Sequence, residues 1–543
     1  MFNKISFFFL FAWLTGCATA QTSVKTEITQ PKLIVGIVVD QMAYNFLYRY
    51  WDNYSDGGFK RLVNGGFSCE NAYFNYIPTY TGPGHTCIYT GTVPAIHGVV
   101  SNDWFDKNSG KYMYCAQDNT VETVGASSAS GKMSPANMLT TTICDELKLF
   151  NNMHSKVIGI SLKDRGAILP AGHLADAAYW YDGYSSAWIS STYYMQELPA
   201  WVSDFNSKNI AVGYLNKGWD LLLSPEMYKN STDDNVSWEG TAIGEAAPVF
   251  PHRYIGITNT EAIKATPMGN TFTKDFAVAS LKKEELGKDI YTDFLAVSFS
   301  STDYVGHRYG NYALEIEDTY IRLDKDLADF FTILDTEVGS GNYLVFLTAD
   351  HGVATSPAYA KHLNIPSGGI YESAIQKQLD SILASSLGQN SWIRAYTNQN
   401  IYLNDSLLAA KKIPIQEIYE ILYTSLIKED GIANVILTKE ITTASIPEKT
   451  KQLFINGMYA KRSGDIFIQY EPNWMDVYGE TGTTHGSHYS YDTHVPLLWY
   501  GWKIPKGKTN RNVAITDIAA TLAALLHIQQ PNGCIGDVIT EIK

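Results

Sequence analysis

The chain has 543 residues, of which 41 are Lys or Arg and 55 are Asp or Glu, so its formal net charge at pH 7 is −14. This length suits one large α/β domain with insertions or several smaller domains, and composition does not choose between them. The acidic balance and the absence of a Lys/Arg-rich stretch exclude a broad electrostatic surface for nucleic acid, so we expect no nucleic acid as a specific ligand.

The N-terminus has the order of residues typical of an export signal. Lys4 precedes an apolar run at residues 7–14, which is too short to span a bilayer, and small residues follow. Two processing sites compete: ATA at residues 18–20 resembles a signal-peptidase site, and LTGC at residues 14–17 resembles a bacterial lipobox, which would put a lipid anchor on Cys17. Both predict export, either to the periplasm or as an outer-membrane or cell-surface lipoprotein.

The processing site before Gln21 defines a signal peptide of residues 1–20, and the polar, threonine-rich residues 21–30 are expected to form a tether. No later stretch is long and apolar enough for a transmembrane helix. The remaining cysteines are scattered, without paired spacing, which favours structural over catalytic roles and leaves disulfide formation after export open. They are Cys69, Cys87, Cys115, Cys144 and Cys534.

Four apolar segments, each ending in polar or charged residues, are typical of strands buried on both faces. They are residues 33–40, 157–165, 294–303 and 343–352. Between the last two, residues 315–335 have apolar side chains at helical spacing, which completes a strand–helix–strand unit of a parallel sheet. Another helix is expected over residues 516–528, with Thr516 or Asp517 as its N-cap.

Two segments lack this pattern. Residues 174–290 are dense in Tyr and Trp and lack long apolar runs, so we expect an insertion over a face of the sheet. We interpret it as a folded cap rather than a sugar-binding platform, because aromatic side chains most often serve burial. Residues 390–475 have the pattern of short strands around a helix, which predicts a small α+β insertion. The fold class predicted is α/β, with residues 31–543 as one domain that carries both insertions.

Carboxylates follow three of the predicted strands. Asp40, Asp303 and the pair Asp350-His351 stand at strand ends, where the functional residues of open α/β sheets collect. Each aspartate alone could simply cap the next helix. Their recurrence at several strand ends favours a common site.

Histidines supply further candidate ligands. His307 follows Asp303 by four residues, which places both on one side of a helical turn, as a shared metal requires. The polar loop GTTHGSHYSYDTH offers His485, His488 and His494. Aspartates and histidines in this combination form oxygen/nitrogen sites that suit zinc. Two metal ions about 4 Å apart would stabilise the attacking and leaving oxygens of an in-line displacement.

The stretch TYTGPGHTCIYTG at residues 79–91 would supply the attacking hydroxyl. Its Gly-Pro-Gly predicts the start of a helix with Pro83 at the first helical position. An anion is favoured beside the N-terminus of such a helix. Spacing alone leaves Thr81 open as helix cap or nucleophile, and Thr79 is nearly as good a candidate.

A series of motifs in order resembles the alkaline phosphatase superfamily and, within it, the single-chain monoesterases of the PafA type. The motifs are LIVGIVVDQM, TYTGPGH, TGTVPAIHGVVSNDWFD, SLKDRGA, SSTDYVGH, TADHG, TTHGSHYSYDTHVPL and DIAATLAALL. The resemblance covers most of the mature chain. It implies an alkaline-phosphatase-like three-layer sandwich with a mostly parallel central sheet and inserted cap segments.

The resemblance also implies a role for each candidate residue. The nucleophile falls on the threonine directly before Gly-Pro-Gly-His, which is Thr81 rather than Thr79. His488 stays outside the ligand set as a neighbour in a polar loop. One Zn2+ would be held by Asp303, His307 and His485, and the other by Asp40, Asp350, His351 and the Thr81 oxygen. The residues that match phosphate-contacting positions are Asn102, Lys163 and Arg165, the last two marking the monoesterase group.

The activity implied is hydrolysis of small-molecule phosphate monoesters, over a broad range, to an alcohol and inorganic phosphate through a phosphothreonine intermediate. Two Zn2+ ions with Lys163 and Arg165 outweigh three aspartates and the Thr81 alkoxide, and the excess positive charge neutralises a monoester dianion. The alternatives are a phosphodiesterase of the nucleotide pyrophosphatase type, which SLKDR disfavours, a sulfatase, whose CxPxR or SxPxR motif is replaced, and a non-catalytic surface-binding lipoprotein. A monomer is expected, because the insertions would cover the surfaces that other members use to dimerise.

Overall fold

The four apolar segments predicted as strands pair with one another at the centre of a mixed sheet. In the computed structural model, which describes Met1 and residues 30–254, 256–477, 479 and 481–543, this sheet has ten strands. The predicted signal peptide and most of the predicted tether lie outside the described residues. The strand order is β19 (Gly507–Thr509), β2 (Phe67–Cys69), β18 (Leu497–Gly501), β11 (Tyr343–Thr348), β1 (Leu33–Val39), β10 (Asp293–Phe299), β7 (Val157–Ser161), β8 (Ala177–Asp182), β9 (Ala187–Ser191) and β6 (Thr123–Val124).

The centre of the sheet is parallel. β11, β1, β10, β7 and β8 run in the same direction, whereas β18 and β9 on either side are antiparallel to their neighbours. Every residue of β1, β7, β10 and β11 is buried. Burial on both faces explains why these strands are continuous apolar runs without alternation.

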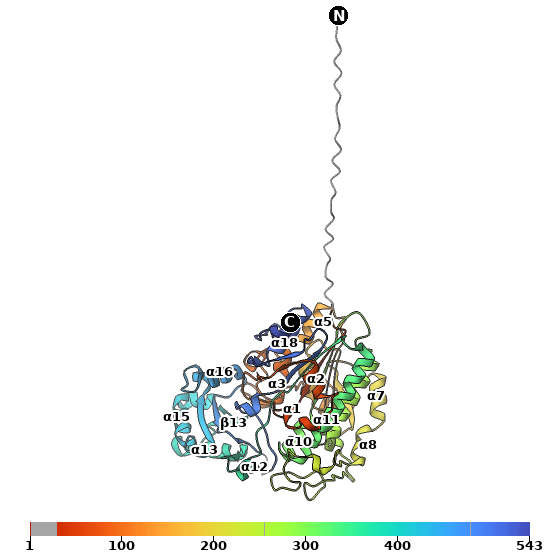
Figure 1. Ribbon diagram of the computed structural model, residues 1–543. Helices are drawn as coiled ribbons and strands as arrows, with labels where there is room; N and C mark the ends of the chain where they lie inside the picture. Colours follow the sequence, from red (N-terminus) through yellow and green to blue (C-terminus); the bar gives the residue numbers. More distant parts are fainter. Residues whose placement is uncertain (2–29, 255, 478, 480) are drawn as a thin grey trace. The chain divides into compact units, whose positions relative to one another are not determined.

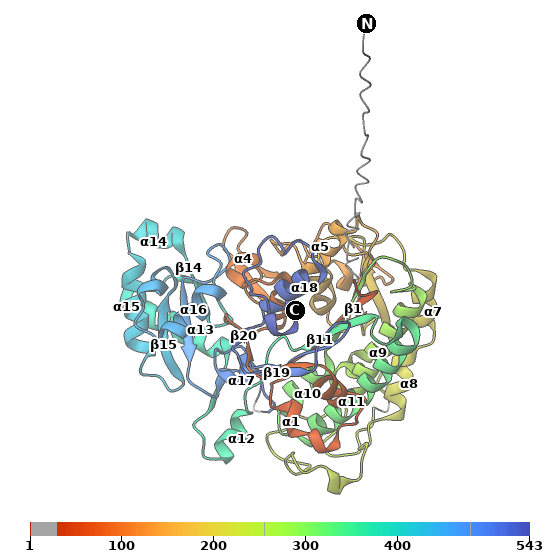
Figure 2. The same ribbon diagram turned by 45° about the horizontal axis from the view of Figure 1, so that its top comes forward.

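Helices cover both faces of the sheet (Figures 1 and 2), so the predicted three-layer sandwich is confirmed. One layer contains α3 (Thr81–Thr90), α5 (Ile143–Phe150), α6 (Asp164–Ala171) and α18 (Asp517–Leu526), which pack on one another. The other contains α2 (Phe59–Gly65), α9 (Pro267–Lys283), α10 (Ser301–Tyr309) and α11 (Leu314–Leu334). The helices predicted over residues 315–335 and 516–528 correspond to α11 and α18.

The prediction of an insertion over residues 174–290 was wrong for both ends of that segment. The first end forms β8 and β9, two strands of the central sheet, and α9 at the other end packs against β7 and β10. These strands were missed because their buried residues are aromatic and polar as well as aliphatic, so neither strand is a continuous aliphatic run. Trp188 of β9 stacks on Phe276 of α9, with ring centroids 4.2 Å apart. Among the described residues of this segment, α7 (Ala200–Ser207), α8 (Ile210–Lys217), the short 3-10 helices Pro225–Met227 and Thr260–Ala265, and the connecting loops lie outside the sheet and α9.

Residues 372–476 contain a second, smaller sheet with its own helices, drawn together on one side of Figures 1 and 2. The order of its four described strands is β13 (Ile393–Thr397), β14 (Asn400–Leu403), β16 (Ile466–Tyr470) and β15 (Ile432–Leu437). α13 (Glu372–Leu387) and α15 (Ile415–Leu426) bury a separate hydrophobic cluster against it, with Leu379 and Leu422 fully buried. The α+β insertion expected at residues 390–475 thus lies within this unit, which begins earlier, at α13.

Short elements complete the described part of the chain. The helices are α1 (Phe46–Arg49), α4 (Pro94–His97), α12 (Pro357–His362), α14 (Asp405–Lys411), α16 (Glu448–Gly457) and α17 (Ser490–Thr493). The strands are β3 (Ala72–Tyr73) with β20 (Val513–Ala514), β4 (Asp103–Asp106) with β5 (Lys111–Tyr114), and β12 (Gly368–Ile370) with β17 (Trp474–Asp476).

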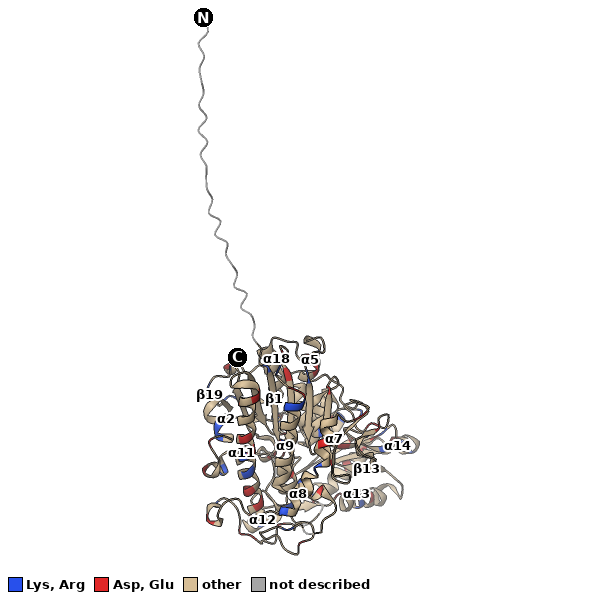
Figure 3. Cartoon of the chain, turned by 90° about the vertical axis from the view of Figure 1, so that its right-hand side faces the viewer, with Lys and Arg blue, Asp and Glu red and all other residues tan. Residues whose placement is uncertain are grey.

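Two further sequence expectations concern cysteines and charge. The five described cysteines are all free thiols, and four of them are buried, so the disulfides left open by the sequence do not form among them. Acidic and basic residues are interspersed on the face seen in Figure 3. None of the described helices is long and apolar enough to cross a membrane.

We expect Leu347→Ala to lower the free energy of unfolding by about 2–5 kcal/mol, because this fully buried side chain of β11 would leave a cavity at the centre of the sheet. Chemical denaturation followed by tryptophan fluorescence measures the change. Ile290→Ala is the control: this side chain is 90% exposed, and its loss should change stability by less than about 0.5 kcal/mol. Equal effects of the two substitutions would contradict the assignment of β11 to the core.

Candidate active site

The carboxyl ends of four neighbouring parallel strands bring the predicted site residues to one edge of the sheet. Residues that are far apart in the sequence become neighbours there, because each strand delivers its own polar residues to the same place. They are Asp40 after β1, Lys163 and Arg165 after β7, Asp303 and His307 on α10 after β10, and Asp350 and His351 after β11.

Two groups of buried ligand atoms, each spanning less than 4.8 Å, could hold a metal ion. Asp40, Asp350 and His351 form the first group, and these are three of the four ligands predicted for one Zn2+. Asp303, His351 and His485 form the second group. The imidazole of His351 therefore lies at the junction of the groups, and its ring stacks on that of His485 with centroids 3.4 Å apart.

His307, the third ligand predicted beside Asp303 and His485, lies at the edge of the second group. Its Nε2 atom is 3.0 Å from Asp303 Oδ1, and its ring centroid is 5.3 Å from that of His485. Both Asp303 and His307 are on α10, separated by one helical turn. The four-residue spacing in the sequence thus produces the side-by-side placement that was predicted from it.

Hydrogen bonds to main-chain carbonyls orient the three imidazoles. In each ring the Nδ1–H donates to a carbonyl oxygen, so the Nε2 lone pair faces the carboxylates and is available to a metal. The pairs are His307 with Thr483 at 2.8 Å, His351 with Gly352 at 3.0 Å, and His485 with Thr79 at 2.7 Å.

The carboxylates of the first group require a positive charge. Asp40 Oδ1 and Asp350 Oδ2 are buried and accept no hydrogen bond. Burial, together with the charges of Asp303 and Asp350, raises the pKa of Asp40 well above its usual range. Buried carboxylates of this kind are stable when they are paired or coordinate a metal. The donor set of carboxylate oxygens and imidazole nitrogens therefore fits a metal cofactor.

Lys163 joins the two groups. Its ammonium lies 2.6 Å from Asp40 Oδ2 and 2.6 Å from Asp303 Oδ2, and the side chain is buried. Although burial lowers the pKa of a lysine, the two aspartates raise the pKa of Lys163 above its usual value. The sequence assigned Lys163 only to phosphate, so its contact with both carboxylates is an addition from the structure.

The two candidate hydroxyls have different surroundings. α3 begins at Thr81 and its N-cap is Tyr80, so Thr81 is the first helical residue rather than the cap, and the cap alternative fails. The Thr81 Oγ1 lies 3.5 Å from His351 Nε2, at the first metal group. Thr79 instead donates its hydroxyl to the carbonyl of Ser487, at 3.0 Å. Pro83 is the third residue of α3 rather than the first, because the helix starts two residues earlier than predicted.

Asn102 and Arg165 are held in place by contacts that the sequence did not show. Asn102 Oδ1 accepts a hydrogen bond from the Gly82 amide at 2.8 Å, next to Thr81. Arg165 donates from Nη1 to the hydroxyl of Tyr114 at 3.0 Å, and that hydroxyl donates to Asp164. Tyr114 comes from β5, a short strand whose sequence gives no signal of a link to α6.

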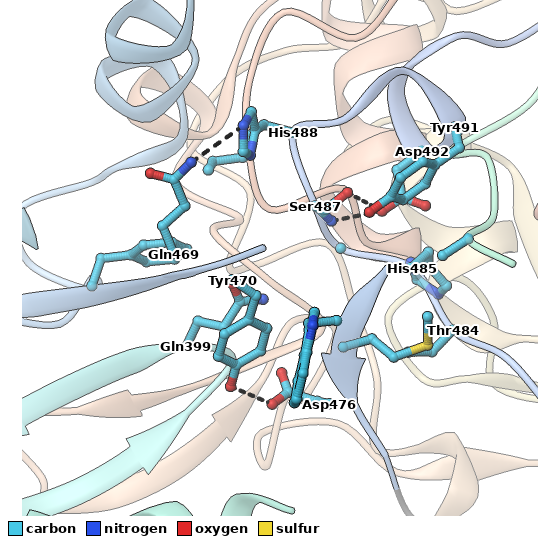
Figure 4. A pocket seen from close by; sticks show the side chains of 16 residues that line it. Gln399, Gln469, Tyr470, Asp476, Thr484, His485, Ser487, His488, Tyr491 and Asp492 are labelled. Atoms are coloured by element: carbon cyan, nitrogen blue, oxygen red, sulfur yellow. Dashed lines mark hydrogen bonds between the residues drawn. The ribbon is translucent and has the colours of Figure 1, made fainter. Parts of the chain in front are cut away.

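The loop that carries His485 is fixed by Asp492, another residue that the sequence did not single out. Figure 4 shows the Asp492 carboxylate accepting from the main-chain amide and the hydroxyl of Ser487, at 2.7 and 2.6 Å. The Asp492 carbonyl also accepts from the Gly352 amide, at 2.7 Å. Asp492 therefore connects the loop of His485 with the segment after β11.

The flanking histidines of that loop point elsewhere. His488 lies 3.3 Å from the Gln469 amide, across the cavity drawn in Figure 4. His494 contacts the carbonyl of Glu70 at 3.0 Å and stacks on Tyr44 and Tyr73. Neither belongs to a metal group among the described residues.

The model of the type I phosphodiesterase / nucleotide pyrophosphatase family matches residues 34–492. The chain belongs to this family. It is 45% identical over 539 residues to the alkaline phosphatase PafA of Elizabethkingia meningoseptica, covering 98% of each chain. It is 46% identical over 528 residues to the alkaline phosphatase PhoV of Synechococcus elongatus, covering 97% of this chain and 95% of that one.

The crystal structure of wild-type PafA superposes on this protein with a TM-score of 0.92 at 45% identity, covering 95% of this chain and 99% of that chain. The alkaline-phosphatase-like fold expected from the motifs is confirmed by this superposition. The resemblance to the PafA-type members of the alkaline phosphatase superfamily is confirmed as well.

We expect Zn2+ to raise the melting temperature of the metal-free protein, because a ligand that binds only the folded state stabilises it. The double variant Asp40→Asn/Asp350→Asn removes the negative charge of the first group and should lose most of this rise. Asp326→Asn is the matched control, since Asp326 is also a buried aspartate but bonds to Thr271. Scanning fluorimetry with and without Zn2+ measures the shift. A rise of equal size in all three proteins would contradict the metal assignment.

Proposed function

We propose that this protein is an alkaline phosphatase that hydrolyses phosphate monoesters to an alcohol and inorganic phosphate, with Thr81 as the nucleophile. The observation that carries the proposal is the position of the Thr81 hydroxyl, which stands in the first turn of α3 and lies 3.5 Å from His351 Nε2 of the first metal group. The named phosphatases to which the chain is 45–46% identical over nearly its whole length support it.

Two Zn2+ ions complete the proposed site. Asp40, Asp350, His351 and the Thr81 oxygen would hold one, and Asp303, His307 and His485 the other. When bound, the ions supply positive charge for the attacking and leaving oxygens of an in-line displacement. The oriented imidazoles, and the buried Asp40 and Asp350 oxygens that accept no hydrogen bond, support this assignment.

The reaction that these residues support is a double displacement. Thr81 attacks phosphorus, the alcohol leaves, and the phosphothreonine is then hydrolysed by water. The N-terminus of α3 presents main-chain N–H groups and a positive dipole end, which favour the phosphate beside Thr81. Because Asn102 uses its Oδ1 to accept from Gly82, its Nδ2 donors are directed to other acceptors, and we assign them to a phosphate oxygen.

Monoester specificity is proposed to come from Lys163 and Arg165. Phosphoryl transfer develops charge on the oxygens that are not bonded to the leaving group, and fixed cations stabilise that charge. The two negative charges of a monoester dianion can be neutralised by the two cations. A diester has a single negative charge and a second bulky group, so it gains less from them. The family description includes phosphodiesterases, so diester hydrolysis is the alternative that a direct comparison must exclude.

The cellular setting is also part of the proposal. The apolar run at residues 7–14 and the small residues after it support export, either to the periplasm or as a lipoprotein anchored through Cys17. Small-molecule phosphate monoesters are the proposed substrates, and the protein is proposed to act as a monomer.

Thr81→Ala should abolish turnover of an aryl phosphate, because it removes the hydroxyl that lies 3.5 Å from His351 Nε2 at the first metal group, and zinc should still bind through the three remaining ligands. Thr81→Ser retains a hydroxyl and should retain measurable activity. Release of the aryl alcohol is followed by absorbance, and zinc content by mass spectrometry. Undiminished activity of Thr81→Ala would refute the nucleophile assignment.

Removing Lys163 and Arg165 together, as Lys163→Ala/Arg165→Ala, should lower kcat/KM for an aryl phosphate by more than about 100-fold. The loss for a bis-aryl phosphate should be much smaller, because the diester lacks the second charge. Lys148→Ala is the matched control, a buried lysine paired with Asp176 instead. Zinc content is measured for each variant, since Lys163 also contacts two aspartates. Equal losses on both substrates at equal zinc content would contradict the proposed specificity.

A further inference from the structure

Gln41 contacts the carboxylates of both metal groups. Its side-chain Nε2 donates to Asp303 Oδ1 at 2.7 Å, and its main-chain N–H donates to Asp350 Oδ1 at 3.2 Å. It directly follows Asp40, and only 2% of its surface is exposed. We propose that Gln41 is a positioning residue that sets the metal affinity of the site by holding one carboxylate of each group. This proposal rests on the metal sites of the proposed function.

The main chain at Gln41 has an unusual conformation that makes these contacts possible. Its φ is 65°, in the left-handed region that residues other than Gly, Asn and Asp rarely adopt. In a continued strand, successive side chains point to opposite faces, so Asp40 and Gln41 would face apart. The left-handed turn at Gln41 follows the end of β1. It directs the side chains of Asp40 and Gln41, and the main-chain N–H of Gln41, to the same site.

The neighbouring helix α10 leaves space for the Gln41 side chain. A Cβ atom added at Gly306 would lie 2.0 Å from Gln41 Oε1, and the three heavy atoms nearest to it all belong to Gln41. Gly306 lies between Asp303 and His307 on α10, at a helical position where alanine has the better intrinsic propensity. Gly306 is therefore explained by the Gln41 side-chain amide, which packs closely against the helical turn that carries Asp303 and His307.

The contact with Asp303 has a direct chemical consequence. Asp303 Oδ2 is held by Lys163 at 2.6 Å, while Oδ1 receives the Gln41 amide and lies 3.0 Å from His307. Both oxygens of this carboxylate thus have fixed neighbours, so its plane is fixed. Hydrogen bonds that orient a ligating carboxylate change metal affinity or activity by about 10–100-fold when they are removed.

Gln41→Gly tests the proposal, because glycine adopts the same φ without strain and keeps the N–H to Asp350 while it removes the amide to Asp303. We expect the zinc affinity, measured by competition with a chromogenic chelator, to fall about 10–100-fold. The melting temperature of the metal-free protein should not fall. Asn209→Gly is the matched control, an exposed residue with φ of 49°, and its zinc affinity should equal that of the wild type. A residue with only a structural role would change the melting temperature and leave the affinity unaltered.

Gly306→Ala supplies a second, independent variant. Its methyl group should displace the Gln41 amide and lower zinc affinity to a similar extent, whereas in the Gln41→Gly background the same substitution should cost no further affinity. Additive losses, or a Gln41→Gly protein that binds zinc as tightly as the wild type, would overturn the proposal and leave the proposed function intact. A wild-type protein that binds no zinc would overturn both.

Discussion

Three buried aspartates lie close together at the edge of the sheet, and the rest of the site depends on how their charge is neutralised. Asp40 and Asp350 are fully buried and Asp303 is 3% exposed. Like charges buried so close together are unstable unless cations lie among them. Lys163 supplies one cation, and the oxygens of Asp40 and Asp350 that accept no hydrogen bond favour a further one. In the proposed function, the cations that stabilise the aspartates would also provide the binding site for an anion.

The parallel sheet is what makes this concentration of charge possible. Its central strands are buried on both faces, so they hold their carboxyl ends in fixed positions without polar groups in the core. His485 lies in a loop that is far along the chain from Thr79. Two sets of hydrogen bonds hold it: its own Nδ1–H donates to the Thr79 carbonyl, and Asp492 accepts from Ser487 in the same loop. The segment before α3 and the loop of His485 therefore hold each other in place.

Features governed by short-range periodicity could be predicted from the sequence, and those governed by distant contacts could not. β1 and β10 are continuous apolar runs, and the pairing of Asp303 with His307 follows from helical spacing. β8 was missed because its buried residues are aromatic and polar as well as aliphatic. Tyr114 and Gln41 were not identified as site residues, since a left-handed φ and a contact between separate elements leave no periodic signal.

Thr79 and Thr81 show how a local change of conformation separates two chemically identical residues. Two residues apart in an extended chain, they would share a face, and the sequence alone could not choose between them. The helix begins at Thr81, which turns the second hydroxyl toward His351 and leaves the first bonded to Ser487. Thr79 nevertheless serves the same site, because its carbonyl fixes the proton of His485 on Nδ1. The start of one helix thus divides two threonines into a proposed nucleophile and a support for a proposed metal ligand.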